Sequence, residues 1–283
     1  MNNIPLENLD NTFGRVKLHQ HIGNIILEHS TNQSPLGSIV YKEIHFEDYI
    51  SVADIGCGYG RCINHLDKIV PSDSEYIGID PLESNRIPFL NTTNTAGFSG
   101  KYMCGNADSI SEFPDNYFDL ILCNFSLYFF IDTLPTIVNK LKSDGLFITI
   151  THSTNSLKEL LKDLQIVLNI DHNSTWNELG SEQVLDNFNA ENGLELLQPY
   201  FTEIKKIDYH NTLEFEYEDI DKLFDLLQFK KTSLIHHNDY ADFIKTEEFD
   251  EKLRDTISSK INKFGKYILN KDDTIFRCRK NNG

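Results

Sequence analysis

Three glycines at alternate positions, Gly56, Gly58 and Gly60, follow a short apolar stretch of the chain. Glycine accepts positive φ angles, and it has no Cβ atom that would hold a ligand away from the backbone. The stretch before these glycines, 49–55, is rich in β-branched residues, and residues 61–66 carry apolar side chains at helical spacing. This segment predicts a strand, a tight turn and a helix whose free N–H groups face a nucleotide cofactor.

Two carboxylates accompany the glycine turn. Asp80 ends the next predicted strand, where a carboxylate can accept hydrogen bonds from both hydroxyls of a cofactor ribose. A nicotinamide dinucleotide and S-adenosylmethionine present the same ribose, so Asp80 leaves both open. Asp54 lies inside an apolar strand, where an acid costs free energy unless it has partners. We expect Asp54 to accept N–H groups of the turn and to lie near a positively charged ligand, which favours a sulfonium cofactor; the alternative is an acid that only braces the turn.

Two later segments end at the same edge of the predicted sheet. Residues 105–108 follow the third strand and form either a clamp on an adenine ring or an ordinary turn. Residues 124–128 follow the fourth strand, and the carboxyl ends of strands in an open α/β sheet face the ligand. The aromatic residues there border the cofactor and the substrate, or else pack in the core. The predicted cofactor-binding residues are Asp54, Gly56, Cys57, Gly58, Gly60, Asp80, Pro81, Asn106, Ala107, Asp108, Asn124 and Phe125.

The elements that would position these residues alternate between strand and helix. The predicted strands are 49–55, 75–80, 101–104, 118–125, 146–152, 204–215 and 274–279. Near-continuous apolar strands separated by helices indicate a parallel sheet buried on both faces. A helix over 13–29 precedes the first strand and either covers the cofactor as a lid or packs on the sheet edge. After the fifth strand, Ser156 and Glu159 have the spacing of a capping box at a helix start.

Composition narrows the classes of partner. The formal net charge is −17, and so acidic a surface repels nucleic acid and suits a cationic or neutral small molecule, or it serves solubility alone. The five cysteines have no CxxC spacing, which disfavours a disulfide framework or a zinc site and favours a cytoplasmic location. We expect no signal peptide, because the N-terminus lacks a basic region followed by an apolar one, and no membrane span.

Four motifs resemble those of the class I S-adenosylmethionine-dependent methyltransferases, in their order and spacing. Residues 52–60 (VADIGCGYG) resemble motif I of that family, and Asp80 matches its ribose-binding acid. Residues 113–121 (FPDNYFDLI) resemble its "FPDNSFDLV" segment, and 141–147 (LKSDGLF) resemble its "LKPGGxL" turn into strand five. The adenine-site acid expected just after Gly105 is Asn106 here, so this contact falls either to Asn106 or to Asp108.

The resemblance implies a Rossmann-like, doubly wound α/β sheet of seven strands with strand seven antiparallel. It implies three parts: an N-terminal helical lid over 1–48, an S-adenosylmethionine-binding core over 49–152, and a helical insert with strands six and seven over 153–283. It also implies methyl transfer by direct displacement, which needs positioning more than a protein nucleophile. The acceptor would be a small molecule methylated on nitrogen or oxygen, such as a natural product or an amine. The alternatives are a nicotinamide-dependent oxidoreductase and a protein that binds S-adenosylmethionine without catalysis.

A general base helps only where the acceptor is protonated at working pH. The candidates are His152, at the end of strand five, and Tyr128, beyond strand four. His19 and His21 reach the site if the N-terminal helix is a lid. The pair His236 and His237 lacks an acid at metal-ligand spacing, so we expect no metal site. Trp176 and Tyr200 are candidates for the wall of the acceptor pocket.

Overall fold

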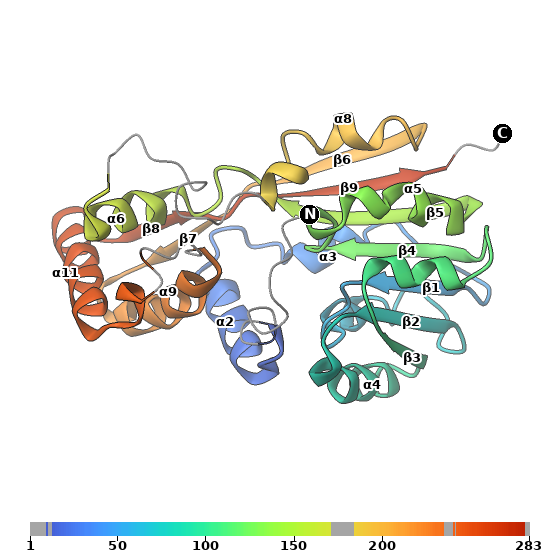
Figure 1. Ribbon diagram of the computed structural model, residues 1–283, viewed down its shortest axis with the longest axis horizontal. Coiled ribbons are helices and arrows are strands. Elements are labelled where there is room, and N and C mark those ends of the chain that lie inside the picture. The colour runs from blue at the N-terminus through green and yellow to red at the C-terminus, as the bar shows by residue number, and fades with distance from the viewer. Residues whose placement is uncertain (1–9, 11–12, 171–183, 235–239, 241, 281–283) are drawn as a thin grey trace.

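The computed structural model has two lobes joined by extended strands (Figure 1). It describes residues 10, 13–170, 184–234, 240 and 242–280. The strands are β1 (Ser51–Ile55), β2 (Glu75–Asp80), β3 (Ser99–Cys104), β4 (Phe118–Asn124), β5 (Leu141–His152), β6 (Glu203–Tyr209), β7 (Thr212–Phe215), β8 (Tyr267–Asn270) and β9 (Asp273–Arg279). The α-helices are α2 (Val16–His29), α3 (Leu36–Val40), α4 (Arg86–Thr95), α5 (Leu134–Lys140), α6 (Lys158–Leu168), α8 (Gly193–Leu197), α9 (Ile220–Leu234) and α11 (Glu247–Phe264). Within these described residues, no helix combines the length and apolar character needed to cross a membrane.

One lobe is built on a seven-stranded sheet with the order β3-β2-β1-β4-β5-β9-β6. Its first five strands run parallel to one another, and β9 lies antiparallel between β5 and β6. The predicted doubly wound sheet with an antiparallel last strand is therefore confirmed. The parallel strands end together at the edge that faces the other lobe (Figure 1).

Both faces of this sheet are covered because alternate residues of its strands point to opposite sides. On β1, Val52 packs in one hydrophobic cluster with residues of α3 and α4. Ala53 and Ile55 pack in another with residues of α5 and α8. Val52 and Ile55 are almost completely buried. The strands form near-continuous apolar runs because helices cover both faces of the sheet, as the sequence predicted.

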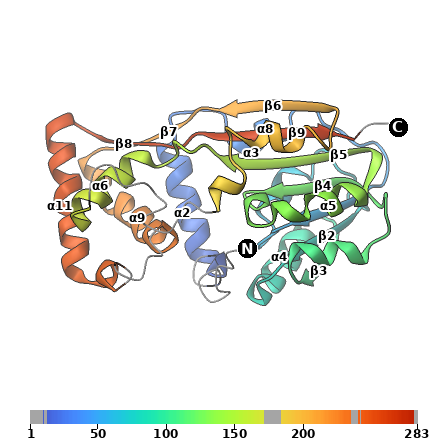
Figure 2. The same ribbon diagram turned by 45° about the horizontal axis from the view of Figure 1, so that its top comes forward.

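The second lobe has its own hydrophobic core and its own small sheet. Helices α2, α6, α9 and α11 and strands β7 and β8 contribute to one apolar cluster, separate from the two beside the large sheet. Helix α2 packs against α9 and β7 of this lobe, on the side that faces the large sheet (Figure 2). The predicted N-terminal part (1–48) and C-terminal part (153–283) are therefore each divided between the lobes: α2, α6, α9 and α11 build the second lobe, whereas α3, α8, β6 and β9 belong to the lobe of the large sheet.

The expectation of one long strand over 204–215 is wrong. Strand β6 belongs to the large sheet, whereas β7 pairs with β8 in a two-stranded antiparallel sheet. Between them the backbone N–H of Asn211 donates to the Asp272 carboxylate at 2.8 Å. The paired segment is interrupted at the same place, between β8 and β9. The β6–β7 segment and the β8–β9 segment therefore both pass between the large sheet and the small one.

The predicted capping box at the start of α6 is also wrong. Leu157 occupies the cap position with a φ of 61° and makes no side-chain cap. Glu159 accepts instead from the backbone N–H of Asn270 at 2.9 Å, at the end of β8. The Glu159 carboxylate therefore makes a tertiary contact with β8 and does not cap the start of its own helix.

Candidate active site

The glycine turn lies at the carboxyl end of β1 and has the predicted conformation. Gly56, Gly58 and Gly60 all have positive φ angles, of 75°, 51° and 85°. A Cβ atom on Gly56 would lie 2.4 Å from that of Ser126, whereas one on Gly58 would meet no atom within 4 Å. Packing therefore requires glycine at position 56, while Gly58 presents bare backbone to open space.

The predicted helix after the turn is only a short 3₁₀ helix over Arg61–His65. Ile63 and Leu66, three residues apart, are both fully buried in the same cluster. A 3₁₀ helix has three residues per turn, so this spacing places both side chains on one face.

Asp80 ends β2 beside the turn and is 7% exposed. Its Oδ2 accepts from the backbone N–H of Gly58 at 2.9 Å, and its Oδ1 accepts from the N–H of Leu82 at 3.0 Å and from the Asn85 amide at 3.3 Å. Burial raises the pKa of Asp80, and these hydrogen bonds oppose the rise. Asp80 thus holds the glycine turn and has acceptor capacity left on Oδ2.

Asp54 does not hold the turn in the way we expected. Its carboxylate is 1% exposed and accepts from the Tyr76 hydroxyl at 2.9 Å. The turn N–H groups of Gly56 and Gly58 donate elsewhere, to the Ile79 carbonyl and to Asp80. Burial raises the pKa of Asp54 to about 7. Asp54 therefore lies beneath the turn as a buried acid with a hydroxyl partner.

The segment after β3 carries both candidates for the adenine contact, Asn106 and Asp108. Asp108 accepts from the Thr133 hydroxyl at 2.8 Å, which joins this segment to the start of α5. Asn106 is exposed just before the 3₁₀ helix that begins at Ala107. Pro81 lies nearby, because its carbonyl accepts from the Cys104 thiol at 3.5 Å. Both residues therefore stay candidates for the adenine contact, since the exposed Asp108 carboxylate keeps acceptor capacity beyond its bond with Thr133.

Asn124, at the end of β4, carries a buried polar atom without a partner. Its Nδ2 donates to the Tyr41 hydroxyl and to the Cys62 sulfur, both at 3.2 Å. Its Oδ1 is buried and has no hydrogen-bond partner among the described residues. A buried carbonyl oxygen without a donor is costly, so this atom is an acceptor that a ligand donor can satisfy.

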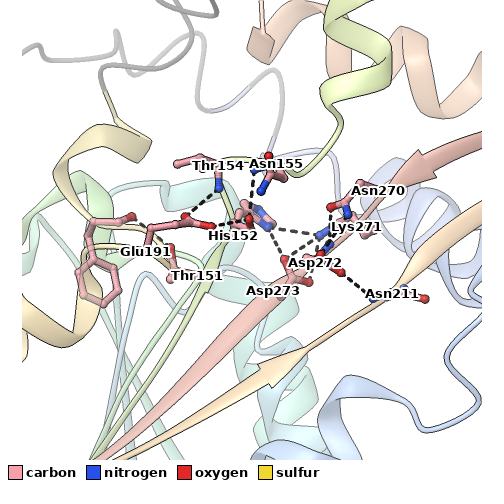
Figure 3. Close-up of polar contacts among 12 residues, drawn as sticks. Thr151, His152, Thr154, Asn155, Glu191, Asn211, Asn270, Lys271, Asp272 and Asp273 are labelled. Atoms are coloured by element: carbon pink, nitrogen blue, oxygen red, sulfur yellow. Dashed lines mark hydrogen bonds and ion pairs between the residues drawn. The ribbon is translucent and has the colours of Figure 1, made fainter.

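His152 ends β5 and forms a hydrogen-bonded dyad with Asp273 (Figure 3). The two residues are cross-strand partners of β5 and β9, and His152 Nδ1 lies 2.6 Å from Asp273 Oδ1. The Lys271 ammonium donates to both Asp273 oxygens at 3.0 Å. With the Nδ1 proton directed at Asp273, the lone pair of the neutral ring lies on Nε2.

The surroundings of the dyad keep His152 neutral. Burial, with Lys271, lowers the pKa of His152 to about 4, although Asp273 opposes this. Burial alone would raise the pKa of Asp273, but Lys271 and His152 lower it. The side chain of His152 is 22% exposed, so the ring is reachable from one side.

Aromatic rings fix the orientation of His152. The Phe125 ring lies 4.7 Å from the His152 ring at an interplanar angle of 30°, and the Tyr128 ring lies 6.4 Å away. Phe125 has a φ of 56°, an uncommon conformation for a bulky residue. Burial raises the pKa of Tyr128 well beyond neutral pH. Tyr128 is therefore a poor base and serves as part of the wall beside His152.

Helix α2 reaches the glycine turn from the second lobe. His19 Nδ1 lies 3.4 Å from the Tyr59 hydroxyl, and the His19 ring packs edge-on against Phe229 of α9 at 5.7 Å. Burial, then Arg61 and Lys230, lowers the pKa of His19 to about 4. His21, by contrast, bonds Asp225 of α9 at 2.9 Å on the exposed side of the helix. Of the two predicted histidines, His19 alone lies at the turn.

Several residues of the site carried no clear signal in the sequence. Asp273 and Lys271 belonged to a predicted turn, and only the pairing of β9 with β5 brings them to His152. Tyr200 lies elsewhere, in a groove of about 330 Å³ lined by α5 and α8 residues. Trp176, His236 and His237 fall outside the residues that the structure describes. Among those described, no three His, Cys, Asp or Glu side chains form a candidate metal site.

The residues present fit the cofactor that the sequence predicts, S-adenosylmethionine. Gly58 offers open space for a close approach to the backbone. Asp80 lies beside it with a free acceptor position for a ribose hydroxyl. The orphaned Oδ1 of Asn124 can accept from the amino group of the cofactor. Three separate features at the carboxyl edge of the sheet therefore match groups of one ligand.

Comparisons with known proteins agree with this geometry. Residues 53–149 match the family model of a methyltransferase domain. The YcgJ protein of Bacillus subtilis has a similar fold, with 15% identity and a TM-score of 0.53, over 94% of this chain and 100% of that protein. Phosphoethanolamine N-methyltransferase 2 of Haemonchus contortus, in complex with phosphomonomethylethanolamine and S-adenosylhomocysteine, has 15% identity and a TM-score of 0.51, over 97% of this chain and 60% of that one. No curated protein matches the sequence.

Proposed function

We propose that this chain, which carries a class I S-adenosylmethionine-dependent methyltransferase domain, methylates a nitrogen or oxygen atom of a small molecule such as an amine or a natural product. S-adenosylmethionine is the cofactor of that domain. The observation that carries the proposal is the dyad of His152 and Asp273 at the strand ends beside the glycine turn. Methyl transfer to a hydroxyl or ammonium group needs a base at this place.

The bound cofactor supplies an electrophilic methyl group. His152 accepts at Nε2 the proton that the acceptor's hydroxyl or ammonium group gives up. Asp273 holds the ring in the required tautomer through Nδ1, and its charge partly offsets the effect of burial and Lys271 on the imidazolium that forms. Phe125 and Tyr128 keep the ring in position, and their apolar faces exclude water from one side of it. We assign cofactor binding to residues 49–152 and the cover of the acceptor to the second lobe.

The fold supports this substrate class by analogy. The nematode relative is an N-methyltransferase whose complex contains a small phosphorylated amine. In this chain, α2 and α9 of the second lobe lie beside the glycine turn through His19 and Phe229, where they can enclose an acceptor of similar size. We also propose a cytoplasmic location, since all five cysteines are free thiols.

Calorimetric titration with S-adenosylmethionine, S-adenosylhomocysteine and NADH tests the cofactor. We expect the first two to bind and NADH not to bind; NADH binding alone would favour an oxidoreductase. A panel of amines and phenols is then incubated with protein and S-adenosylmethionine, and S-adenosylhomocysteine is measured. Formation with an acceptor, lost in His152→Gln, supports the proposal. Tight cofactor binding without turnover on any acceptor would support a non-catalytic binding protein instead.

A further inference from the structure

Three basic side chains from distant parts of the sequence lie around the dyad and the glycine turn. Lys271 lies 3.3 Å from His152 Nδ1, and its ammonium lies 5.7 Å from the centre of the Phe125 ring. Arg61 follows the glycine turn directly, and its guanidinium lies 3.8 Å from where a Cβ of Gly23 on α2 would be. Lys230 completes this basic cluster, which we define as Arg61, Lys230 and Lys271.

Lys230 reaches the cluster from α9 in the second lobe. The preceding residue, Phe229, packs against His19, and His19 in turn lies against Tyr59 in the glycine turn. Helix α9 therefore approaches the glycine turn at this point through His19 of α2. Lys230 is only partly exposed there, and its ammonium lies 5.7 Å from the centre of the Phe229 ring, close enough to the turn and the dyad for the charges of Lys271 and Arg61 to act on it.

The charges around Lys230 disfavour its own ammonium. Burial, followed by Lys271 and Arg61, lowers the pKa of Lys230 to about 8, and Asp273 opposes the change. Asp273 is already bonded to Lys271 and His152. A further anion placed here would gain favourable interactions with several cations at once, in a poorly hydrated place where such interactions are strong. In a chain with a net charge of −17, this concentration of positive charge is local and specific.

We propose that Lys230, together with Arg61 and Lys271, binds an anionic group, a carboxylate or a phosphate, on the methyl acceptor. This inference rests on the proposed function, because it places the acceptor between the dyad and α9. It also changes the expectation drawn from the overall charge, which favoured a cationic or neutral acceptor. The acceptor would carry a nucleophilic nitrogen or oxygen for His152 and an acidic group for Lys230.

The test measures anion binding to the protein saturated with S-adenosylhomocysteine, so that the cofactor's own carboxylate is already bound. Inorganic phosphate and acetate are titrated separately at constant ionic strength, and the rise in Tm reports binding. The wild type is compared with Lys230→Met, Lys230→Arg and Lys252→Met. Lys252 is an exposed lysine of α11 bonded to Glu248, and its loss removes the same charge from the same lobe.

We expect saturable binding of one or both anions by the wild type and a roughly 10- to 100-fold loss of affinity in Lys230→Met, as for a lost hydrogen bond to a charged group. Lys230→Arg should restore part of that loss, and Lys252→Met should behave as the wild type. A preference for phosphate or for acetate identifies the acidic group. No saturable binding by the wild type, or equal binding by Lys230→Met, would overturn the inference. If S-adenosylhomocysteine itself fails to bind, it is the proposed function that is wrong.

Discussion

Replacement of Asp80 tests the ribose assignment quantitatively. A carboxylate has about four acceptor positions, and in this structure three are taken by Gly58, Leu82 and Asn85. One position, on Oδ2, remains for a ribose hydroxyl, rather than the two bonds that the sequence predicted. A single hydrogen bond to a charged group is worth about 1.5–3 kcal/mol. Asp80→Ala should therefore weaken S-adenosylhomocysteine binding by roughly 10- to 150-fold in calorimetric titration.

The same substitution has a separate cost in stability. It leaves the N–H groups of Gly58 and Leu82 without their acceptor, at about 1–3 kcal/mol for each donor that water cannot reach. Asp80→Asn keeps the volume and one acceptor oxygen, so it should fold better and lose less affinity than Asp80→Ala.

Glu83→Ala is the matched control, because Glu83 is an exposed carboxylate on the same loop, and its surface ion pair with Arg86 contributes little to stability. An Asp80→Ala variant that keeps the wild-type affinity would refute the ribose assignment, whatever its melting temperature.

Three other perturbations separate the remaining roles. Gly58→Val places a side chain in the open space beside the turn, at a φ of 51°, so cofactor affinity should fall far more than stability. Gly265→Val is the control, because Gly265 also has a positive φ, of 84°, and open space around it. It should cost a similar strain of about 1–2 kcal/mol and leave cofactor affinity unchanged. His152→Gln should lower kcat by roughly 10²- to 10⁴-fold with an active acceptor while cofactor affinity holds, and a normal rate would exclude the base. The folded-state pKa of His19, about 4, lies below the ordinary 6.5, so the unfolded chain binds more protons between these values. The wild type should lose stability relative to His19→Gln as pH falls from 6.5 towards 4, and parallel melting curves across this range would contradict the burial of His19.

The sequence by itself determined the core of this protein. The apolar strand, the alternating glycines and Asp80 lie close together along the chain, and their geometry depends on local rules: positive φ at glycine and the common edge where parallel strands end. The glycine turn and the parallel sheet followed from these patterns, and the seven-stranded sheet with an antiparallel last strand followed from the family resemblance.

Only the tertiary structure decided which side chains from distant segments become partners, because local sequence patterns do not determine long-range pairing. Glu159 has the spacing of a capping residue but bonds the end of β8. Asp54 was expected at the turn but lies against Tyr76. His152 and Asp273 are far apart in the sequence, and the register of β9 against β5 sets them opposite each other. Lys230 comes near them only because α9 packs against α2, whose His19 lies at the glycine turn, so the proposed acceptor site depends on how the two lobes meet.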